Sequence, residues 1–370
     1  MNRREFLKSS GRVALASTLL TAACEGTSST EQKRVLVLGG TNFLGPALVE
    51  TLIADGHEIT LFNRGVTNPE LFPHVEKLHG FRSIDSADQD WTSLASRHFD
   101  AIVDVWPAEP EIVSSAARLL KDRAQHYLYV SSIGAYDHRE FAKPGIVITE
   151  SSPLHPWDLP GRAYNRNKAE SERRLHDIVG ERLTIVRPTG IKGHRDDTPS
   201  LLTWLVRMQS GGEHIAPGNG QDPFQMIDVK DVARFLALAI AKSLYGTFNV
   251  TGRLMNFREY LEACKTATHS DAVLTWIPQQ FLHEHGLDSD SVLHTYAGNF
   301  PSWLPELDYQ GFYRVSSDKA FQAGWRIRPF DETAFDCLED YRAEHFMSPS
   351  EVLSPAKEKE VLEAWKRRSG

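Results

Sequence analysis

Cysteine is scarce in this chain. Three cysteines occur among 370 residues, Cys24, Cys264 and Cys337. Cys24 belongs to an N-terminal leader, and the two that remain do not make a disulfide framework, since isolated cysteines are usually small buried apolar residues. No group of cysteines and histidines has the spacing of a metal site. We therefore expect neither a disulfide-stabilised fold nor a bound metal.

An excess of positive charge is also missing. Lysine and arginine number 41 against 49 aspartates and glutamates, which gives a net charge of −8. Such a chain has no broad attraction for the phosphates of nucleic acids or for anionic lipid, so we expect no nucleic-acid partner. The composition, 41% hydrophobic and 24% charged, is typical of a soluble globular protein long enough for about two domains.

Long apolar runs are absent from the N-terminus, where a modest run covers Val13–Ala23. It is too short to cross a bilayer as a mature helix and is typical of the core of a signal peptide. Arg3 and Arg4 precede it and are followed by Phe6-Leu7-Lys8. This pattern resembles a twin-arginine (Tat) export signal. The alternative is a cytosolic leader that contains a chance pair of arginines.

Small residues before Cys24 resemble a lipoprotein processing site, although Thr21 stands where such sites usually have leucine. We therefore expect a Tat-type signal over residues 1–24, with Cys24 a candidate for lipidation, and a polar linker over residues 25–33. The expected location is the periplasm or the outer face of a membrane, and contact with the membrane is expected only through the signal or a lipid anchor.

A glycine-rich turn follows the linker. Val35–Leu38 is a continuous apolar run typical of a strand buried on both faces of a parallel sheet. Gly39-Gly40 ends it, and Phe43–Ala54 has apolar residues at helical spacing. A strand, a tight turn and a helix N-terminus bring backbone N–H groups and the positive end of the helix dipole together. This arrangement predicts a site for the pyrophosphate of a dinucleotide.

Strands and helices alternate after this turn. The expected strands are Glu58–Asn63, Ala101–Val105, Tyr127–Val130 and Leu183–Val186, and the expected helices are Ile112–Leu120 and Ala163–Ile178. This alternation predicts an α/β fold with a doubly wound parallel sheet of the Rossmann type. We assign residues 34–189 and 225–252 to it. The ligand is then expected outside the carboxyl ends of the strands.

The pattern changes after Pro188. We expect a helix over Leu201–Gln209, a strand over Phe224–Val229 and a helix over Val232–Ala241, while Gly246–Thr251 could return to the sheet. Residues 190–224 and 253–346 are assigned to a smaller, discontinuous C-terminal lobe on the substrate side, closed by a helix over Asp331–Glu344. Residues 347–370 are expected to form a helical tail whose charges face solvent.

Tyr164 and Lys168 are the residues most indicative of chemistry. Four residues apart, they lie on one face of a helix. An ammonium near a phenol favours phenolate, so Tyr164 can exchange a proton with an alcohol while hydride moves at carbon. Ser132, at the end of an expected strand, can hold the same oxygen. The spacing of Tyr164 and Lys168 means little alone, but here a phosphate-binding turn and a strand-end serine precede it.

The order of these motifs resembles an extended or atypical short-chain dehydrogenase/reductase, the superfamily of the NAD-dependent epimerases and dehydratases. The similar segments span roughly residues 34–344 and follow one another in family order. They are the turn Gly39 to Gly45, Tyr129 to Tyr136, Thr149 to Pro156, Tyr164 to Lys168, Arg187 to Gly193, and Ile227 to Ala233.

The resemblance implies roles for individual residues. Ser132 holds the reacting oxygen, Tyr164 is the acid/base, and Lys168 both lowers the tyrosine pKa and holds the nicotinamide ribose. The implied cofactor contacts are Gly39, Thr41, Asn42, Phe43, Leu44, Gly45, Asn63, Arg64, Ser131, Lys168 and Pro188. It also implies a small carbohydrate-like substrate and a homodimer formed through helices such as Ala163–Ile178.

The chain departs from the family pattern at several positions. Asn42 replaces the middle glycine of the turn, where asparagine tolerates a positive φ better than most residues. Asn63-Arg64 ends the second strand without the acidic residue that usually binds an NAD ribose, which favours NADP over NAD. Ile133-Gly134 cannot transfer a proton, which disfavours sugar dehydration.

Three further residues are weaker candidates for substrate contact, namely His194, Arg195 and Gln225. The expected function is oxidation and reduction at a hydroxyl or carbonyl of a sugar-like substrate. Export away from a nicotinamide pool favours a tightly held cofactor and a redox-neutral, epimerase-like reaction. The alternatives are an ordinary cytosolic NADP-dependent reductase and a non-catalytic binding protein.

Overall fold

The computed structural model describes residues 31–84, 90–105, 109–196, 198, 200–288, 298–305, 311–343 and 353–369. The expected export signal over residues 1–24, including Cys24, and most of the expected linker lie outside this range. The chain from Gln32 onwards forms one compact unit. Within the described residues, no helix is both long and apolar enough to cross a membrane.

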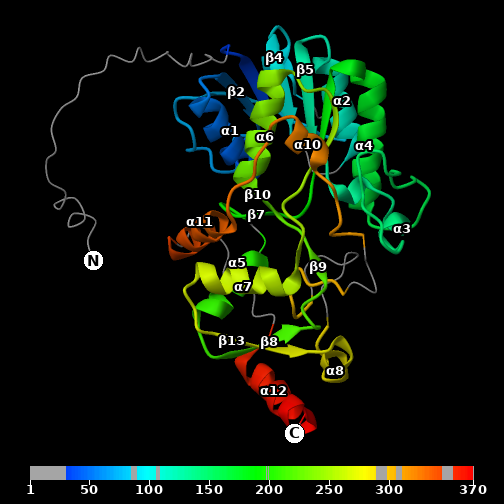
Figure 1. Ribbon diagram of the computed structural model, residues 1–370. Helices are drawn as coiled ribbons and strands as arrows, with labels where there is room; N and C mark the ends of the chain where they lie inside the picture. Colours follow the sequence, from blue (N-terminus) through cyan, green and yellow to red (C-terminus); the bar gives the residue numbers. More distant parts are fainter. Residues whose placement is uncertain are drawn as a thin grey trace, which may run out of the picture. The chain divides into compact units, whose positions relative to one another are not determined.

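A parallel sheet of seven strands organises the described chain (Figure 1). The strand order is β11-β6-β5-β4-β1-β2-β3 and every neighbouring pair is parallel. The strands are β1 (Arg34–Leu38), β2 (Glu58–Asn63), β3 (Glu76–His79), β4 (Phe99–Asp104), β5 (Ala124–Val130), β6 (Leu183–Pro188) and β11 (Gly246–Val250). The order reverses between β1 and β4, where doubly wound sheets bind ligands. The predicted fold class is confirmed.

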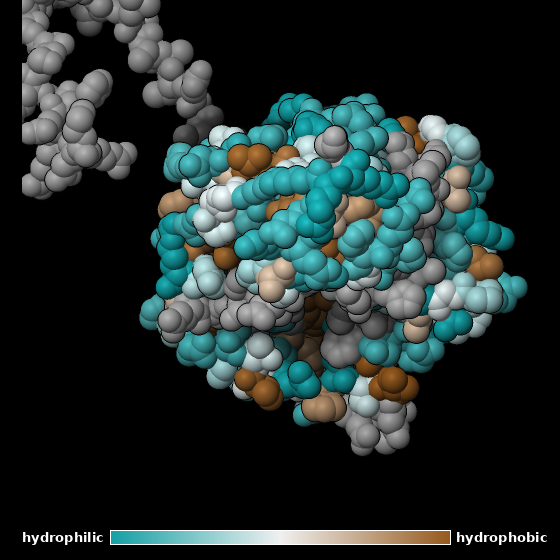
Figure 2. Space-filling view, turned by 90° about the horizontal axis from the view of Figure 1, so that it is seen from below, coloured by the Kyte–Doolittle hydropathy of each residue, from teal (hydrophilic) through white to brown (hydrophobic). Residues whose placement is uncertain are grey.

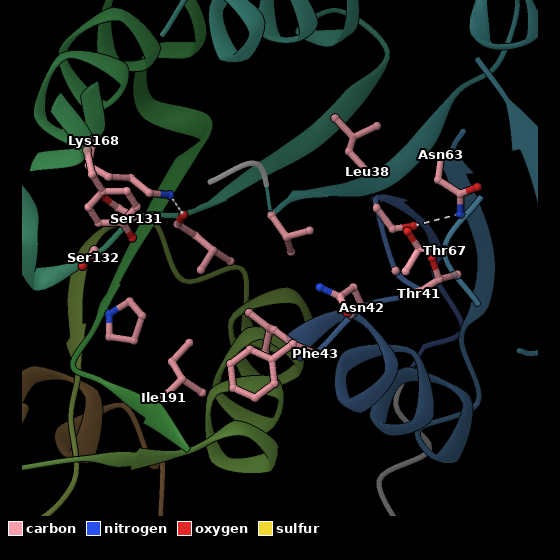
Figure 3. A pocket seen from close by; sticks show the side chains of 18 of the residues that line it. Leu38, Thr41, Asn42, Phe43, Asn63, Thr67, Ser131, Ser132, Lys168 and Ile191 are labelled. Carbon is pink, nitrogen blue, oxygen red and sulfur yellow. Dashed lines mark hydrogen bonds between the residues drawn. The ribbon is translucent and has the colours of Figure 1, made fainter. Parts of the chain in front are cut away.

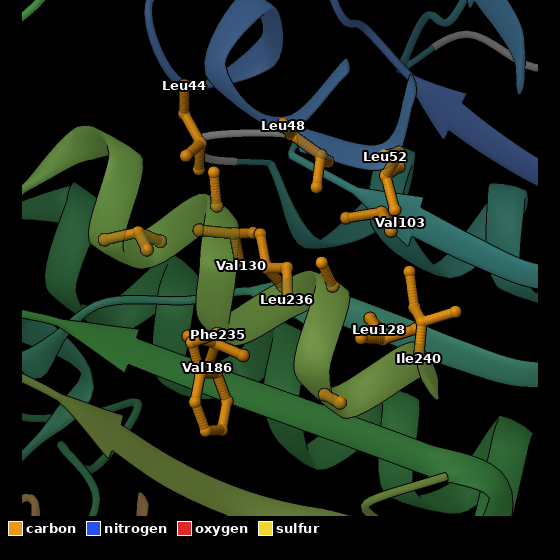
Figure 4. Close-up of a cluster of buried hydrophobic side chains, with 14 of the residues drawn as sticks. Leu44, Leu48, Leu52, Val103, Leu128, Val130, Val186, Phe235, Leu236 and Ile240 are labelled. Atoms are coloured by element: carbon orange, nitrogen blue, oxygen red, sulfur yellow. The ribbon is translucent and has the colours of Figure 1, made fainter. Parts of the chain in front are cut away.

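Helices cover both faces of the sheet. Val35 and Val37 of β1 face one hydrophobic cluster, whereas Leu36 and Leu38 face another, because side chains alternate along a strand. The first cluster packs α1 (Leu44–Ala54) and α6 (Val229–Lys242) against the sheet (Figure 4). The second packs α2 (Pro110–Leu120) and α4 (Ala163–Val179). The N-termini of α1 and α2 follow the ends of β1 and β4 and so lie at the edge that carries the ligand site.

A third hydrophobic cluster lies in the C-terminal part of the chain, around Trp204 and Trp303. It is built on the helices α5 (Ser200–Gln209), α7 (Phe257–Ala267), α8 (Gln279–Glu284), α11 (Phe330–Arg342) and α12 (Pro355–Ser369). The small sheets here pair β7 (Ile191–Lys192) with β10 (Ile227–Asp228), β8 (Glu213–Pro217) with β13 (Val273–Ile277), and β9 (Pro223–Phe224) with β12 (Met255–Asn256). Two further helices are short, α3 (His138–Phe141) and α10 (Asp318–Gln322).

Three features of the fold differ from the sequence-based expectation. The strand expected over Phe224–Val229 is two short strands, β9 and β10, that pair with different partners. The buried Gln225 side chain interrupts it by bonding the backbone of Gly252 and Val315. The edge strand β3 was not expected, because its sequence Glu-Lys-Leu-His has no apolar run. Trp325, assigned to the substrate lobe, packs into the sheet's first cluster.

The charged tail is not wholly solvated. Helix α12 buries Val361 and Leu362 against the third cluster. Its Glu358 accepts hydrogen bonds from the Arg207 guanidinium and the Ile215 backbone N–H, each at 2.7 Å. Against the opposing effect of burial, a hydrogen bond with His214 together with these two contacts holds the pKa of Glu358 below its usual range. The remaining charges of α12 face solvent, as expected.

The two described cysteines, Cys264 and Cys337, are buried, as expected. Burial raises the pKa of both thiols, that of Cys337 to about 12. Among the described residues, no group of three histidine, cysteine or acidic side chains is arranged to hold a metal.

The face in Figure 2 is mainly hydrophilic.

Candidate active site

The glycine turn between β1 and α1 is the first part of the site. Gly39 and Gly40 have φ of 120° and 97°, which favour glycine. A Cβ on Gly45 would lie 2.6 Å from the backbone Cα and carbonyl carbon of Gly40, so only glycine allows α1 to approach the turn this closely. No side chain caps α1 and its first turn holds no acidic residue. Gly45 donates its N–H to the Asn42 carbonyl and Pro46 has none, so an anion here would be bound by the N–H groups at the very start of α1 and by the helix dipole.

The positive φ in this turn falls one residue later than expected. Phe43, the N-cap of α1, has φ 44°, whereas Asn42 is not among the residues with positive φ. The tolerance argued for Asn42 is therefore not what the turn uses. Asn42 is instead an exposed residue that lines the cavity, and its carbonyl accepts a hydrogen bond from Gly45.

The segment after β2 folds back onto the turn. Asn63 donates to the Gly39 carbonyl at 3.2 Å and accepts from the Gly65 N–H at 2.8 Å. Asn68 donates to the Thr41 carbonyl at 2.8 Å. The Asn63 side chain thus holds the backbone of the turn, while the exposed Arg64 lines the cavity beside it.

Lys168 lies at the other end of the site, on α4. Its ammonium is buried and donates to the Val130 carbonyl at 2.7 Å; Figure 3 labels Lys168 beside Ser131 and Ser132. The ammonium lies 5.8 Å from the ring centroid of Tyr164. Burial lowers the pKa of Lys168 to about 7, although the carboxylates of Asp104 and Glu172 act in the opposite direction. The ammonium is therefore poised to gain or lose its proton near neutral pH.

Ser132 and Tyr164 face the same cavity as Lys168. The Ser132 hydroxyl caps a short 3₁₀ turn by accepting from the Gly134 N–H at 3.0 Å. Tyr164 is half-buried. The structure thus brings together the three residues to which the sequence assigned chemistry, from the end of β5 and from α4.

A buried ionic network lies directly behind these residues. Glu172, one turn after Lys168 on α4, accepts from the Ser131 hydroxyl and from both Nε and Nη2 of Arg187. Arg187 in turn lies 4.5 Å from the ring centroid of Tyr136, whose hydroxyl donates to Asn249 at 2.6 Å. The Glu172 carboxylate raises the pKa of Arg187 despite its burial. Ser131, expected to contact the cofactor, lines the cavity but commits its hydroxyl to Glu172.

A second buried ion pair reaches the cavity through Arg82, which lines it. Arg82 binds Asp104, at the end of β4, through two hydrogen bonds of 2.8 and 2.9 Å. Asp104 is fully buried and also accepts from the Tyr127 hydroxyl at 3.0 Å. Sequence reasoning missed this pair and Glu172. The sequence shows only that Asp104 ends an apolar strand and that Glu172 lies on a helix, and neither fact indicates that the carboxylate is buried or which arginine pairs with it.

These parts line one cavity of about 620 Å³. It extends from the glycine turn to Tyr164, and Figure 3 shows Thr41 and Asn63 at one side and Ser132 and Lys168 at the other. Its other lining residues include the expected Leu44 and Pro188. A glycine cradle without room for a Cβ and a long, continuous cavity fit a dinucleotide.

The three candidates for substrate contact do not line this cavity. His194 Nδ1 lies 2.9 Å from Asp340 Oδ2, and the backbone N–H of Arg195 donates to the same carboxylate at 2.7 Å. Gln225 is committed to the backbone of Gly252 and Val315. Each of the three therefore has a partner within the fold.

The amino-acid sequence is similar to those of several known proteins. The chain is 28% identical over 259 residues to a chloroplast stem-loop binding protein of 41 kDa from Arabidopsis thaliana, covering 65% of this chain and 64% of that protein. It is 24% identical over 217 residues to an N-acetyl-α-D-glucosaminyl-diphospho-ditrans,octacis-undecaprenol 4-epimerase from Escherichia coli O157:H7, covering 55% and 61%. The chain thus spans less than two thirds of the length of either relative.

Solved structures share the fold. The Bordetella bronchiseptica enzyme WbmG in complex with NAD has a TM-score of 0.61 at 17% identity, covering 89% of this chain and 100% of that one. The Thermotoga maritima UDP-glucose 4-epimerase with UDP-glucose has a TM-score of 0.60 at 18% identity, covering 84% and 99%. The model of the NAD dependent epimerase/dehydratase family matches residues 35–251, and the chain therefore belongs to that family.

Proposed function

We propose that this protein is an NAD(P)-dependent enzyme that oxidises and reduces a hydroxyl-bearing carbon of a sugar-like substrate without net redox change. The proposal rests on one observation. Ser132, Tyr164 and Lys168 line the same cavity as the glycine turn. A dinucleotide held by the turn thus shares one cavity with the phenol. The solved relatives that bind NAD and UDP-glucose support the same class of chemistry.

The chain's own residues supply proton transfer and orientation. The backbone of the glycine turn and the N-terminus of α1 would hold the pyrophosphate of NAD(P), which would supply a hydride acceptor and donor when bound. Tyr164 removes the proton of the substrate hydroxyl and returns it later. Ser132 donates a hydrogen bond to the same oxygen. Lys168 favours the phenolate through its positive charge, and its pKa near 7 lets it follow the protonation of Tyr164.

Replacement of Tyr164 by phenylalanine tests this proposal. The cofactor-loaded protein is incubated with nucleotide sugars and free sugars, and NMR detects any stereoisomer formed. We expect Tyr164→Phe to lower turnover by about 100-fold to 10,000-fold while the bound cofactor is unchanged. A variant that converts substrate as fast as the wild type would remove the enzymatic role of Tyr164.

NADP is proposed as the preferred cofactor over NAD. Arg64 follows β2 and lines the cavity, where no carboxylate stands beside it among the described lining residues. A guanidinium binds a 2′-phosphate with charge-assisted hydrogen bonds. We expect Arg64→Gln to weaken NADP⁺ binding about tenfold and leave NAD⁺ binding unchanged. Equal losses for both cofactors in calorimetric titrations would contradict this preference.

The leader adds a proposal on location. Export of the chain that follows the expected signal over residues 1–24, past the cytoplasmic pool of nicotinamide, would require a cofactor that stays bound and is regenerated within one turnover, which supports a redox-neutral reaction. Fractionation of a tagged protein, with the N-terminus of the mature chain read by mass spectrometry, tests it. Full-length protein confined to the cytosol would favour the ordinary reductase instead.

Binding of a nucleic-acid stem-loop is the second candidate function. It is favoured by the name of the Arabidopsis thaliana relative. The net charge of −8 opposes it. A gel-shift titration with stem-loop RNA, repeated with Tyr164→Phe, separates the two. Tight binding that ignores the variant, together with no turnover, would favour the binding role.

A further inference from the structure

The charge of the cavity differs from that of the whole protein. The chain carries a net charge of −8, yet the described residues that line the cavity include no aspartate or glutamate. They include four cations, Arg64, Arg82, Arg162 and Lys168. The cavity is therefore suited to anionic groups. The position of each cation indicates which partner or ligand group it binds.

Three of the four cations are accounted for. Arg82 is neutralised by Asp104. Lys168 donates to the Val130 carbonyl beside Tyr164. Arg64 lies next to the glycine turn, because the preceding residue, Asn63, donates a hydrogen bond to the Gly39 carbonyl. The phosphates of a bound dinucleotide thus have the turn and Arg64, which leaves Arg162.

Arg162 lies at the reacting end of the cavity. It directly precedes α4, two residues before Tyr164, and its guanidinium carbon lies 5.9 Å from the ring centroid of that tyrosine. It is half-buried. Within the described part of the chain, no carboxylate forms an ion pair with it. The first turn of α4 likewise carries no acidic residue and no side-chain cap, so nothing there offsets the positive charge.

Arg166, one turn further along α4, provides a contrast. It lies 5.8 Å from the ring centroid of Trp157 and does not line the cavity. Arg162 is the N-cap residue of the helix that contains Arg166, and the two arginines make cation–π contacts of similar length. They differ in that Arg162 alone of the pair faces the cavity beside Tyr164. This difference separates a ligand-binding cation from one that covers a surface tryptophan.

We propose that Arg162 determines substrate specificity by binding a phosphate or carboxylate carried on the reacting sugar unit itself. The proposal rests on the function proposed above and names its substrate class. A guanidinium binds either anion through two parallel hydrogen bonds, and the partly enclosed cavity strengthens the interaction. Because Arg162 lies so close to the phenol, the anion must sit near the carbon that Tyr164 serves. A sugar phosphate and a uronic acid meet this requirement.

Calorimetric titration of the cofactor-loaded protein tests the proposal without requiring turnover. The probes are glucose, glucose 6-phosphate, glucuronic acid and inorganic phosphate. We expect the wild type to bind at least one anionic sugar about tenfold or more tightly than glucose, and the preferred anion identifies the source. Arg162→Gln should abolish this preference and leave the affinities for glucose and for NAD(P)⁺ unchanged. Arg166→Gln should behave as the wild type.

Three results would overturn the proposal. They are equal affinities of the wild type for glucose and for all anionic probes, a parallel loss of glucose binding in Arg162→Gln, and an equal loss in Arg166→Gln. A fall in NAD(P)⁺ affinity in Arg162→Gln would assign the cation to the cofactor instead. Failure of the proposed function appears separately, as absent turnover or an unaffected Tyr164→Phe variant.

Discussion

Lys168 is held in an environment that opposes its own charge. Its ammonium is buried, donates to the Val130 carbonyl and lies 4.7 Å from the ring centroid of Tyr129. The pKa near 7 follows from this burial. A lysine that is half-protonated near neutral pH can respond to the proton on Tyr164, whereas an exposed lysine stays charged throughout.

The low pKa of Lys168 predicts a pH-dependent stability. The pKa is about 7 in the folded state and near its ordinary 10.5 in the unfolded chain. Between these values the unfolded chain binds a proton that the folded protein lacks, so the free energy of unfolding rises with pH. We expect the cofactor-free wild type to gain stability relative to Lys168→Met as pH rises from about 7 to about 10. Urea unfolding at several pH values measures it, and a constant difference between the two proteins would contradict the shift.

The candidate catalytic residues could be proposed from the sequence, and their shared position in one cavity anticipated, because their signal is local. Tyr164 and Lys168 share a helix face at a fixed spacing, and Ser132 follows an apolar strand. Glu172 and Arg82 could not be predicted, because their partners are remote in sequence and nothing local distinguishes a buried charge from an ordinary surface charge. Arg187 with Glu172 and Asp104 with Arg82 become pairs only through the tertiary fold.

At the level of elements, α4 is tied to two strand ends by a single carboxylate. Glu172 binds Ser131 at the end of β5 and Arg187 near the end of β6. Ser132 and Pro188 are the next residues along the chain after these two partners. The position of α4 relative to the serine and to the cofactor end of β6 therefore depends on Glu172.

Removal of the Glu172 charge should disturb both stability and the active site. Glu172→Gln leaves Arg187 buried without its anion, which we expect to cost about 3–5 kcal/mol in the free energy of unfolding. The pKa of Lys168 should fall further, because Glu172 raises it. Glu170→Gln, on the same helix, removes the partly exposed ion pairs with Arg173 and Arg174 and should cost less than about 1 kcal/mol. Similar losses for both variants in urea unfolding would refute the role of Glu172.

A second prediction at the level of elements follows from the contact between α1 and the glycine turn. A Cβ at Gly45 would meet the Gly40 backbone at 2.6 Å, so Gly45→Ala must push α1 away from the turn. We expect a loss of about 1–3 kcal/mol in stability and a marked loss of nucleotide binding. Calorimetric titration with NADP⁺ and NAD⁺ measures the second effect, and unchanged nucleotide affinity in Gly45→Ala would count against the cradle.

Gly56→Ala is the control for this prediction. Gly56 has φ 81°, but a Cβ there would find nothing within 4 Å. The substitution should therefore cost about 1–2 kcal/mol from backbone strain alone. Because Gly56 lies outside the glycine turn, the variant should bind nucleotide normally.

Long strands could be predicted from the sequence, whereas short strands could not. The runs that became β1, β4 and β5 are apolar and continuous, which is the pattern of strands buried on both faces. β3 has four mostly polar residues at the sheet edge, and β9 and β10 have two residues each. Such short elements are defined by backbone pairing with remote segments, so periodicity carries no signal for them.

For the molecule as a whole, charge is distributed unevenly between the surface and the cavity. A net negative chain encloses a cavity whose described lining has cations and no carboxylates. We expect such a cavity to attract the phosphates of a dinucleotide and an anionic substrate, and the surface not to attract nucleic acid broadly. The second expectation follows from composition alone. The first depends on which residues the doubly wound fold brings together.

The central claim is that a nicotinamide dinucleotide lies across the carboxyl ends of the strands, from the glycine turn to Tyr164. Native mass spectrometry of the purified protein, with and without Gly45→Ala, measures this most directly. We predict that the wild type carries one NADP or NAD per chain, either as purified or after addition of the cofactor, and that Gly45→Ala loses it. A wild-type chain that binds neither nucleotide under native conditions would contradict the account.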